Sequence, residues 1–180
     1  MNYEFKTIHP GELYISREPC KISTLLGSCV TVTVYNRGKK FGGMNHFMLP
    51  RYNGEHSRAE DYRFGDLSTR KLLDEIIEID PDRSHLEIKL FGGGRVVDAL
   101  KQAKIGQENL AVAKKIIREY GLRVSNEFVR NETGIKLIFN NYPGKVKAKK
   151  IRRSAASQVE REEARTLQAR ETNVAEILSS

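Results

Sequence analysis

The alternation of apolar and polar positions along the chain predicts several short strands. In residues 29–36, Val30, Val32 and Val34 alternate with threonines, and β-branched residues in this order are typical of a strand. A second apolar stretch covers residues 41–48, after a polar turn that contains glycine. The two stretches are therefore expected to form a hairpin. Weaker patterns predict an edge strand that includes Leu13, Ile15 and Ile22, and strands at 86–90, 122–130, 135–140 and 145–149.

Two other stretches show the spacing of an amphipathic helix. In residues 67–79 the apolar positions fall on one face, Asp66 is placed to cap the start, and Asp80-Pro81 ends the pattern. In residues 107–120 a second apolar face is followed by Gly121, a natural C-terminal stop. Strands mixed with two helices, in a chain of 180 residues, predict an α+β fold. We assign this domain to residues 1–153.

The end of the chain differs in composition from the rest. Residues 154–180 are rich in Ala, Glu and Arg, so we predict a charged extension that is either helical or disordered. The net charge is +8, and six positive charges lie within residues 145–153. Such a run either meets phosphates or an acidic protein surface, or is simply a solvated face. It lacks interleaved aromatic residues for base stacking, which disfavours nucleic acid as the partner.

Several classes of protein are disfavoured by what the sequence lacks. No apolar run has the length that membrane insertion needs, and the first six residues lack the apolar core of a secretion signal, so the cytoplasm is the expected location. Cys20 and Cys29 are too few for a disulfide framework, and no His/Cys cluster has zinc spacing, so no metal is expected. The triplet Gly92-Gly93-Gly94 lacks the flanking residues of a phosphate loop. No cofactor is expected, and a tight strand exit or a close backbone approach explains these glycines better.

The two predicted hairpin strands carry the candidate chemistry. Cys29 opens the first strand after the turn Leu26-Gly27-Ser28, and His46 lies in the return strand. A hairpin of this length sets His46 roughly opposite Cys29, and a thiol facing an imidazole is the minimum equipment for cysteine nucleophilic catalysis. Taken singly, each residue also fits a structural role, the cysteine as a small buried apolar residue and the histidine as a satisfied core residue.

These same residues carry a family resemblance. The segments STLLGSCVTVTVY (residues 23–35) and GGMNHFMLP (residues 42–50) resemble CheD, the chemoreceptor glutamine deamidase of bacterial and archaeal chemotaxis. The resemblance continues in KLFGGG (residues 89–94) and IGQENL (residues 105–110), and covers about residues 1–150. It implies a β-sandwich-like core flanked by helices, similar to the cytotoxic necrotizing factor deamidase toxins.

The resemblance also implies a reaction and its partners. Cys29 would attack the carboxamide of a glutamine on the cytoplasmic helices of a chemoreceptor, and His46 would act as acid and base. Ser23 occupies the position where the family usually has a threonine that orients the histidine. A CheC-type phosphatase is a further expected partner. The alternative is a non-catalytic chemotaxis adaptor that binds receptors or that phosphatase.

Three further residues have expected supporting roles. The backbone amide of Cys29, together with Ser28 or Gly27, would stabilise the oxyanion that forms when a carboxamide is attacked. Ser28 alternatively serves only as a turn residue. Asn45, next to His46, either supports the site or simply holds the backbone of the return strand.

Overall fold

The fold is built from two β-sheets and two α-helices. The computed structural model describes residues 3–52, 61–94, 100–129 and 133–151, together with Arg161 and Arg165, and only the backbone of residues 100–103. One sheet has the strand order β1-β3-β8-β9 and the other β2-β5-β4-β6-β7. The elements are β1 (Glu4–Thr7), β2 (Leu13–Ser16), β3 (Cys20–Leu26), β4 (Val30–Asn36), β5 (Phe41–Asn45), α1 (Gly65–Ile79), a short 3-10 helix (Arg83–His85), β6 (Leu86–Gly92), α2 (Leu100–Glu119), β7 (Val124–Val129), β8 (Ile135–Asn140) and β9 (Lys145–Lys150).

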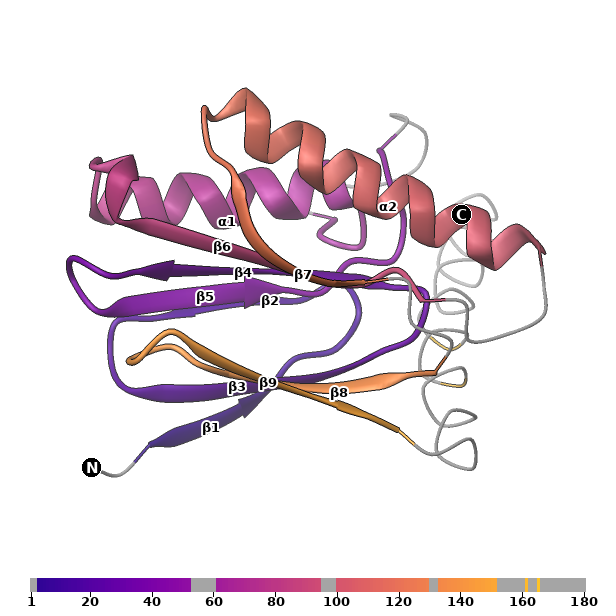
Figure 1. Ribbon diagram of the computed structural model, residues 1–180, viewed down its shortest axis with the longest axis horizontal. Coiled ribbons are helices and arrows are strands. Elements are labelled where there is room, and N and C mark those ends of the chain that lie inside the picture. The colour runs from indigo at the N-terminus through magenta and orange to yellow at the C-terminus, as the bar shows by residue number, and fades with distance from the viewer. Residues whose placement is uncertain are drawn as a thin grey trace, which may run out of the picture.

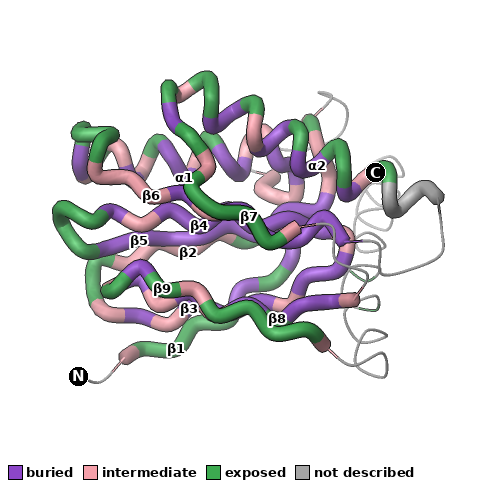
Figure 2. Tube along the Cα trace, in the orientation of Figure 1, coloured by how far each residue is buried: buried purple, intermediate pink, exposed green. Residues whose placement is uncertain are grey.

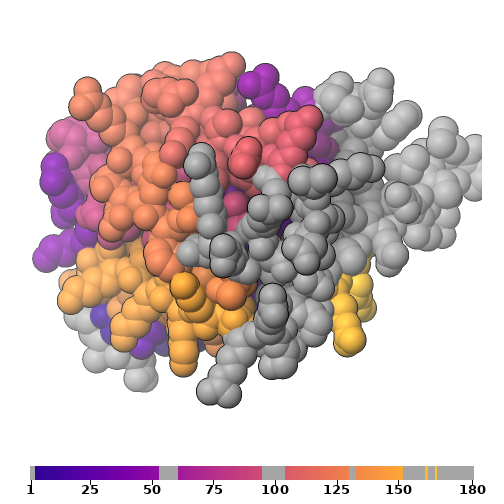
Figure 3. All heavy atoms as spheres, turned by 45° about the vertical axis from the view of Figure 1, so that its right-hand side comes forward, coloured from indigo at the N-terminus to yellow at the C-terminus, as the bar shows by residue number. Residues whose placement is uncertain are grey.

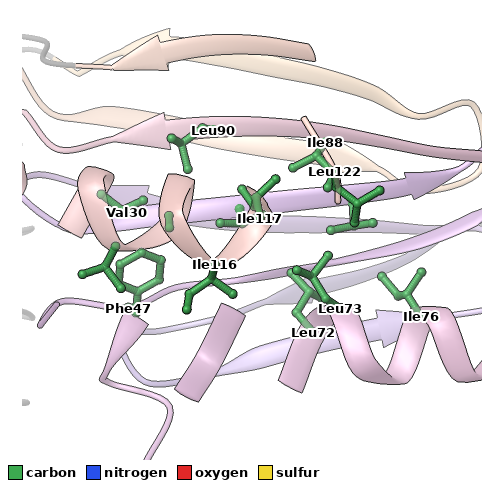
Figure 4. Close-up of a cluster of buried hydrophobic side chains, with 14 of the residues drawn as sticks. Val30, Phe47, Leu72, Leu73, Ile76, Ile88, Leu90, Ile116, Ile117 and Leu122 are labelled. Atoms are coloured by element: carbon green, nitrogen blue, oxygen red, sulfur yellow. The ribbon is translucent and has the colours of Figure 1, made fainter. Parts of the chain in front are cut away.

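The elements form three layers, with the five-stranded sheet in the middle. The four-stranded sheet packs on one of its faces, and α1 and α2 cover the other (Figure 1). Two buried clusters fill the spaces between the layers. On the helix side, Val30 and Phe47 pack with Leu72 and Ile116 (Figure 4). Between the sheets, Cys29 and Met44 belong to a second cluster with residues of β3 and β8.

The central strands β4 and β5 of the middle sheet are almost completely buried, whereas β7 at its edge is largely exposed (Figure 2). Strand β4 is its central element and pairs with β5 on one side and β6 on the other, both antiparallel. The predicted hairpin of residues 29–36 and 41–48 is confirmed by the β4–β5 pairing. The predicted α+β class, with a sheet core flanked by helices, is also confirmed.

Three boundaries differ from the sequence prediction. Leu13 and Ile15 lie in β2 and Ile22 lies in β3, two strands of different sheets, where we expected one edge strand that includes all three. Helix α1 begins at Gly65 with Phe64 at its N-cap position, so the predicted capping role of Asp66 is wrong. The Asp66 carboxylate instead accepts hydrogen bonds from the backbone amides of Tyr52 and Leu67. Helix α2 begins at Leu100, because residues 101–104 are good helix formers even though no apolar face marks them.

Two sequence predictions concern residues that the structure does not describe. The charged extension of residues 154–180 lies outside the described residues, apart from Arg161 and Arg165. Most of the polar segment after the return strand, residues 53–60, also lies outside them.

Candidate active site

Cys29 lies in the short connection between β3 and β4, and its side chain is 1% exposed. The glycine triplet at the end of β6 is hydrogen-bonded to this connection. The backbone amide of Gly93 donates to the carbonyl of Cys29 at 2.8 Å, and the amide of Gly94 donates to the carbonyl of Gly27 at 3.0 Å. Gly92 has a φ of 98°, and a Cβ there would lie 2.1 Å from the Cys29 carbonyl oxygen. The triplet therefore supports the Cys29 connection by close backbone approach.

His46 directly follows β5, and its backbone is held on both sides. Its amide donates to the carbonyl of Glu12 and its carbonyl accepts from the amide of Gly11, both at 2.8 Å. The next residue, Phe47, pairs with Val30 through two backbone hydrogen bonds of 2.9 and 3.0 Å. The strand carrying His46 is thus fixed against the strand that follows Cys29.

This pairing brings Cys29 and His46 onto the same face of the sheet. Val30 and Phe47 both point toward the helices, so their neighbours Cys29 and His46 point toward the other sheet. The two residues form a diagonal pair across the ladder, and diagonal pairs lie about 7–8 Å apart or somewhat less at Cβ. Both side chains are buried, at 1% exposure each. The hairpin therefore places the two residues diagonally on one face, where the sequence analysis expected them roughly opposite each other.

A threonine hydroxyl on the opposite sheet contacts the imidazole. Oγ1 of Thr24 lies 2.7 Å from Nδ1 of His46, and the same hydroxyl donates to the carbonyl of Ile8 at 2.8 Å. A hydroxyl has one proton, so the bond to Ile8 leaves its oxygen to accept from Nδ1–H. The network therefore assigns the proton of the neutral imidazole to Nδ1 and leaves Nε2 as the unprotonated nitrogen.

The contact with His46 was predicted for Ser23, and the structure assigns it to the next residue. The hydroxyl of Ser23 lies 3.1 Å from that of Thr7, and its carbonyl accepts from the amide of Ile8. The reason is strand alternation, because successive side chains of β3 point to opposite faces. Thr24 lies in the row that faces the other sheet, together with Cys20, Ile22 and Leu26.

Burial sets the charge state of the histidine. The side chain of His46 is removed from solvent, and this desolvation, with a smaller contribution from the nearby His9, lowers the pKa of His46 from 6.5 to about 3. The imidazole is therefore neutral at physiological pH. Its Nε2 is buried and has no hydrogen-bond partner among the described residues. A neutral imidazole with an unprotonated, unpaired Nε2 has the form that a general base requires.

A second buried, unpaired polar atom lies on the same face of the sheet. The register of β4 and β5 places Thr31 directly opposite His46, and Thr31 is fully buried on the same face. Its Oγ1 also has no hydrogen-bond partner among the residues that the structure describes. Directly opposite residues that share no ladder hydrogen bonds bring their side chains closest together. Nothing in the sequence alone marked Thr31 as more than one residue of a strand.

The remaining predicted residues lie around this pair. The side chain of Asn45 points to the opposite face from His46, where its Oδ1 accepts from the amide of Val32 at 2.8 Å and its Nδ2 lies 3.5 Å from the hydroxyl of Thr69. Asn45 therefore holds the strand. Gly27 and Ser28 directly precede Cys29, and their part in an oxyanion site stays a prediction.

Helix α2 supports both halves of the site from the far side of the sheet. Gly106 lies so close to the glycine triplet that a Cβ on it would meet the carbonyl oxygen of Gly93 at 3.0 Å. The buried side chain of Asn109 donates through Nδ2 to the carbonyl of Met48 at 3.0 Å, two residues after His46. The segment IGQENL thus contacts both the connection under Cys29 and the strand of His46.

The described residues contain no group of three or more His, Cys, Asp or Glu side chains arranged to hold a metal ion. Within the same residues, no helix has the combined length and apolar character that crossing a bilayer requires.

Comparison with known proteins gives a consistent picture. The family described as "CheD chemotactic sensory transduction" matches residues 48–150, which include the glycine triplet and IGQENL. Relatives named probable chemoreceptor glutamine deamidase CheD cover more of the chain. The protein of Methylobacillus flagellatus is 34% identical over 154 residues, 84% of this chain and 76% of the relative. The protein of Trichlorobacter lovleyi is 34% identical over 140 residues, which are 77% of this chain and 86% of the relative. The protein of Methanococcus vannielii is 32% identical over 141 residues, which are 78% of this chain and 91% of the relative.

Proposed function

The chain belongs to the CheD family, and from that premise we propose that it is a chemoreceptor glutamine deamidase whose nucleophile is the thiol of Cys29. One observation carries the cysteine mechanism. The hydrogen bond from His46 to Thr24 leaves Nε2 unprotonated on the face of the sheet that also bears Cys29. A base held in one tautomer beside a thiol is the arrangement that activates a cysteine.

The first half of the reaction forms a thioester. Nε2 of His46 takes the thiol proton while the sulfur of Cys29 attacks the carboxamide carbon of glutamine. The imidazolium then gives this proton to the amide nitrogen, the C–N bond breaks and ammonia leaves. Because burial disfavours the imidazolium, His46 rests as a neutral imidazole and the proton moves during attack. We expect the amides of Cys29 and of Ser28 or Gly27 to stabilise the oxyanion.

The second half releases glutamate. Nε2 takes a proton from water, the hydroxide adds to the thioester carbon, the C–S bond breaks and the sulfur regains its proton. We assign the positioning of this water to the hydroxyl of Thr31, which is directly opposite His46 and otherwise unpaired among the described residues. A water bridging two buried polar atoms satisfies both of them.

The relatives are named as chemoreceptor deamidases, and the proposal about partners is based on that name. We propose that the cytoplasmic domain of a chemoreceptor is the substrate, with a CheC-type phosphatase as a second partner, and that the reaction takes place in the cytoplasm. Cys29 and His46 are both buried, so the glutamine side chain reaches them only when part of the surface above them moves.

The deciding experiment is ammonia release from a purified chemoreceptor cytoplasmic fragment. We expect wild type to release ammonia and convert glutamine to glutamate, and Cys29→Ala and His46→Ala to lose at least about a thousandfold in rate while staying folded. Cys20→Ala is the matched control, because Cys20 is equally buried in the same cluster but does not border His46. Release at the wild-type rate by Cys29→Ala would exclude the cysteine mechanism. Receptor binding without any ammonia from wild type would favour the adaptor.

A further inference from the structure

The outer face of the β1-β3-β8-β9 sheet is left uncovered by the described elements. Both helices lie on the far side of the molecule, beyond the five-stranded sheet (Figure 1). Side chains of β8 alternate between buried and exposed, with Ile135, Leu137 and Phe139 inside. The alternate residues of all four strands therefore form one outward-facing surface, which we call the outer face.

Lysines dominate the outer face. The β8–β9 register places Lys149 opposite Lys136, Lys147 opposite Ile138 and Lys145 opposite Asn140. On the next strand, Lys21 lies opposite Asn140. None of the outward residues of the four strands is acidic. These residues are Phe5, Thr7, Lys21, Ser23, Leu25, Lys136, Ile138, Asn140, Lys145, Lys147 and Lys149. In the space-filling view, side chains of β8 and β9 project from the surface (Figure 3, orange).

These lysines differ from the lysines of the helices and of the five-stranded sheet. On the helices and the five-stranded sheet, Lys71, Lys89, Lys104, Lys114 and Lys115 each pair with a glutamate. On the outer face, by contrast, no lysine forms an ion pair with a described residue, and Lys21 lies 5.1 Å from the ring of Tyr3. Lys136 and Lys149 even face each other directly, an arrangement that costs stability. The outer face thus carries five lysines that form no ion pair with a described residue, and no carboxylate among the outward residues of its four strands.

Protection of a sheet edge does not account for the whole arrangement. Lysines on an edge strand discourage pairing with other chains, and β9 is such a strand. Lys21 and Lys136, however, belong to β3 and β8, which have neighbours on both sides. The face also carries apolar surface, because Phe5 is 57% exposed and Leu25 and Ile138 are half-buried.

The geometry of the face suits a helix that lies along β9. Lys145, Lys147 and Lys149 follow one another at every second residue of a strand, about 6.8 Å apart, and residues four apart on a helix rise by about 6 Å. The row leads toward the site. Lys150 pairs with Ile135, which pairs with Leu26, and Leu26 is three residues before Cys29. The end of the lysine row is thus about two strand spacings, or about 10 Å, from the strand that leads into Cys29.

We propose that the outer face is the docking surface for an acidic helix of the protein substrate. Acidic side chains at successive turns of that helix would pair with Lys145, Lys147 and Lys149, and its apolar residues would cover Ile138, Leu25 and Phe5. Complementary charge would draw the receptor to this side of the enzyme, from which a glutamine reaches the end of the sandwich that contains Cys29. The identity of the partner rests on the proposed function, whereas the charge and geometry of the face do not.

The test compares two triple variants of the full chain in binding to a purified chemoreceptor cytoplasmic fragment. The face variant carries Lys145→Gln, Lys147→Gln and Lys149→Gln. The control variant carries Lys71→Gln, Lys104→Gln and Lys115→Gln, which removes the same charge from lysines paired on the helices. We expect the Kd of the face variant to rise at least about tenfold at about 50 mM salt, and that of the control less than about twofold. The difference in Kd between the face variant and the control variant should become smaller as the salt concentration rises toward about 300 mM.

Two further measurements separate the outcomes. A short glutamine peptide, too small to reach the face, should be hydrolysed with the same kcat/KM by wild type and the face variant. The proposal would be overturned if receptor binding were weakened equally in the two variants, or if it were not weakened in the face variant. It would also be overturned by binding to phosphatidylglycerol vesicles that the face variant loses while it keeps wild-type receptor affinity. If wild type releases no ammonia but the face variant still loses receptor binding, the deamidase proposal fails and the docking surface stands.

Discussion

The hydroxyl oxygen of Thr24 lies 2.7 Å from Nδ1 of His46, and it joins the two sheets of the sandwich at the candidate active site. Because the same hydroxyl donates to the carbonyl of Ile8, its position is fixed by the backbone of the outer sheet. The tautomer of a histidine on one sheet is thus determined by a strand of the other. This relationship makes the packing of the two sheets part of the proposed chemistry.

The first prediction concerns this hydroxyl. Thr24→Ala removes the acceptor of Nδ1–H, so the imidazole loses both its fixed tautomer and its orientation, and we expect kcat to fall about ten- to a hundredfold. Thr24→Ser keeps the hydroxyl and should retain most of the activity. Ser23→Ala is the matched control on the same strand, and it should stay near wild type because Ser23 contacts Thr7 instead. Ammonia release by the three variants checks this. A larger loss in Ser23→Ala than in Thr24→Ala would reverse the assignment.

The second prediction concerns the dependence of stability on pH. Burial lowers the pKa of His46 from 6.5 to about 3, so below pH 6.5 the unfolded chain takes up a proton that the folded chain refuses. Stability from this group is complete above pH 6.5 and is lost as the pH falls toward about 3. The slope is at most about 1.4 kcal/mol per pH unit. Urea unfolding of wild type and His46→Gln at a series of pH values measures it.

We expect the two urea series to converge as the pH falls, because only wild type loses this contribution. His9→Gln is the control, since His9 is exposed and affects the pKa of His46 only as the smaller cause. That variant should keep most of the wild-type slope. Parallel curves for wild type and His46→Gln would show that His46 is not held neutral by burial.

The third prediction uses two glycines with similar backbone strain. Gly92 and Gly121 have φ values of 98° and 71°, and alanine at either position is strained by about 1–2 kcal/mol. Only at Gly92 would the added Cβ also meet a neighbouring backbone, the Cys29 carbonyl at 2.1 Å, whereas at Gly121 the nearest atom is 4.0 Å away. We therefore expect Gly121→Ala to lose stability but keep its activity. Gly92→Ala should lose more stability and most of its kcat. Equal effects on both quantities would mean that the triplet does not position Cys29.

The sequence predicted most of what depends on local pattern. The hairpin of β4 and β5 follows from alternating β-branched residues around a polar turn. Its register continues to the pairing of Val30 with Phe47, and this pairing puts Cys29 and His46 on the same face. The choice between Ser23 and Thr24 depended instead on the phase of β3. The apolar row of Cys20, Ile22 and Leu26 contains that information, but it becomes visible only once the segment is known to be a strand.

Long-range contacts account for what the sequence did not predict. The sequence did not identify what the glycine triplet contacts, because its neighbour, the Cys29 carbonyl, is remote in the chain and comes close only through the β4–β6 pairing. The basic run of residues 145–153 was visible, but a run does not show which lysines share a surface. The β8–β9 register showed that, and it added Lys136 from another strand.

The last prediction separates stability from catalysis at Thr31. Its hydroxyl is buried and has no partner among the described residues, so Thr31→Val replaces an unsatisfied polar atom with a methyl group of similar size. We expect the free energy of unfolding to stay constant or rise by about 1 kcal/mol. If the hydroxyl positions the water that hydrolyses the thioester, turnover should nevertheless slow about ten- to a hundredfold.

The slow step would be visible as an intermediate. Formation of the thioester does not need this water, so Thr31→Val should release one ammonia per enzyme quickly and then turn over slowly, while the receptor fragment stays linked to Cys29. Rapid-quench ammonia measurement and intact mass of the complex record both events. Thr31→Ser keeps the hydroxyl and should restore steady turnover. A variant that loses the initial burst together with its stability would indicate a packing role for Thr31, because a residue that acts only on water leaves the first half of the reaction intact.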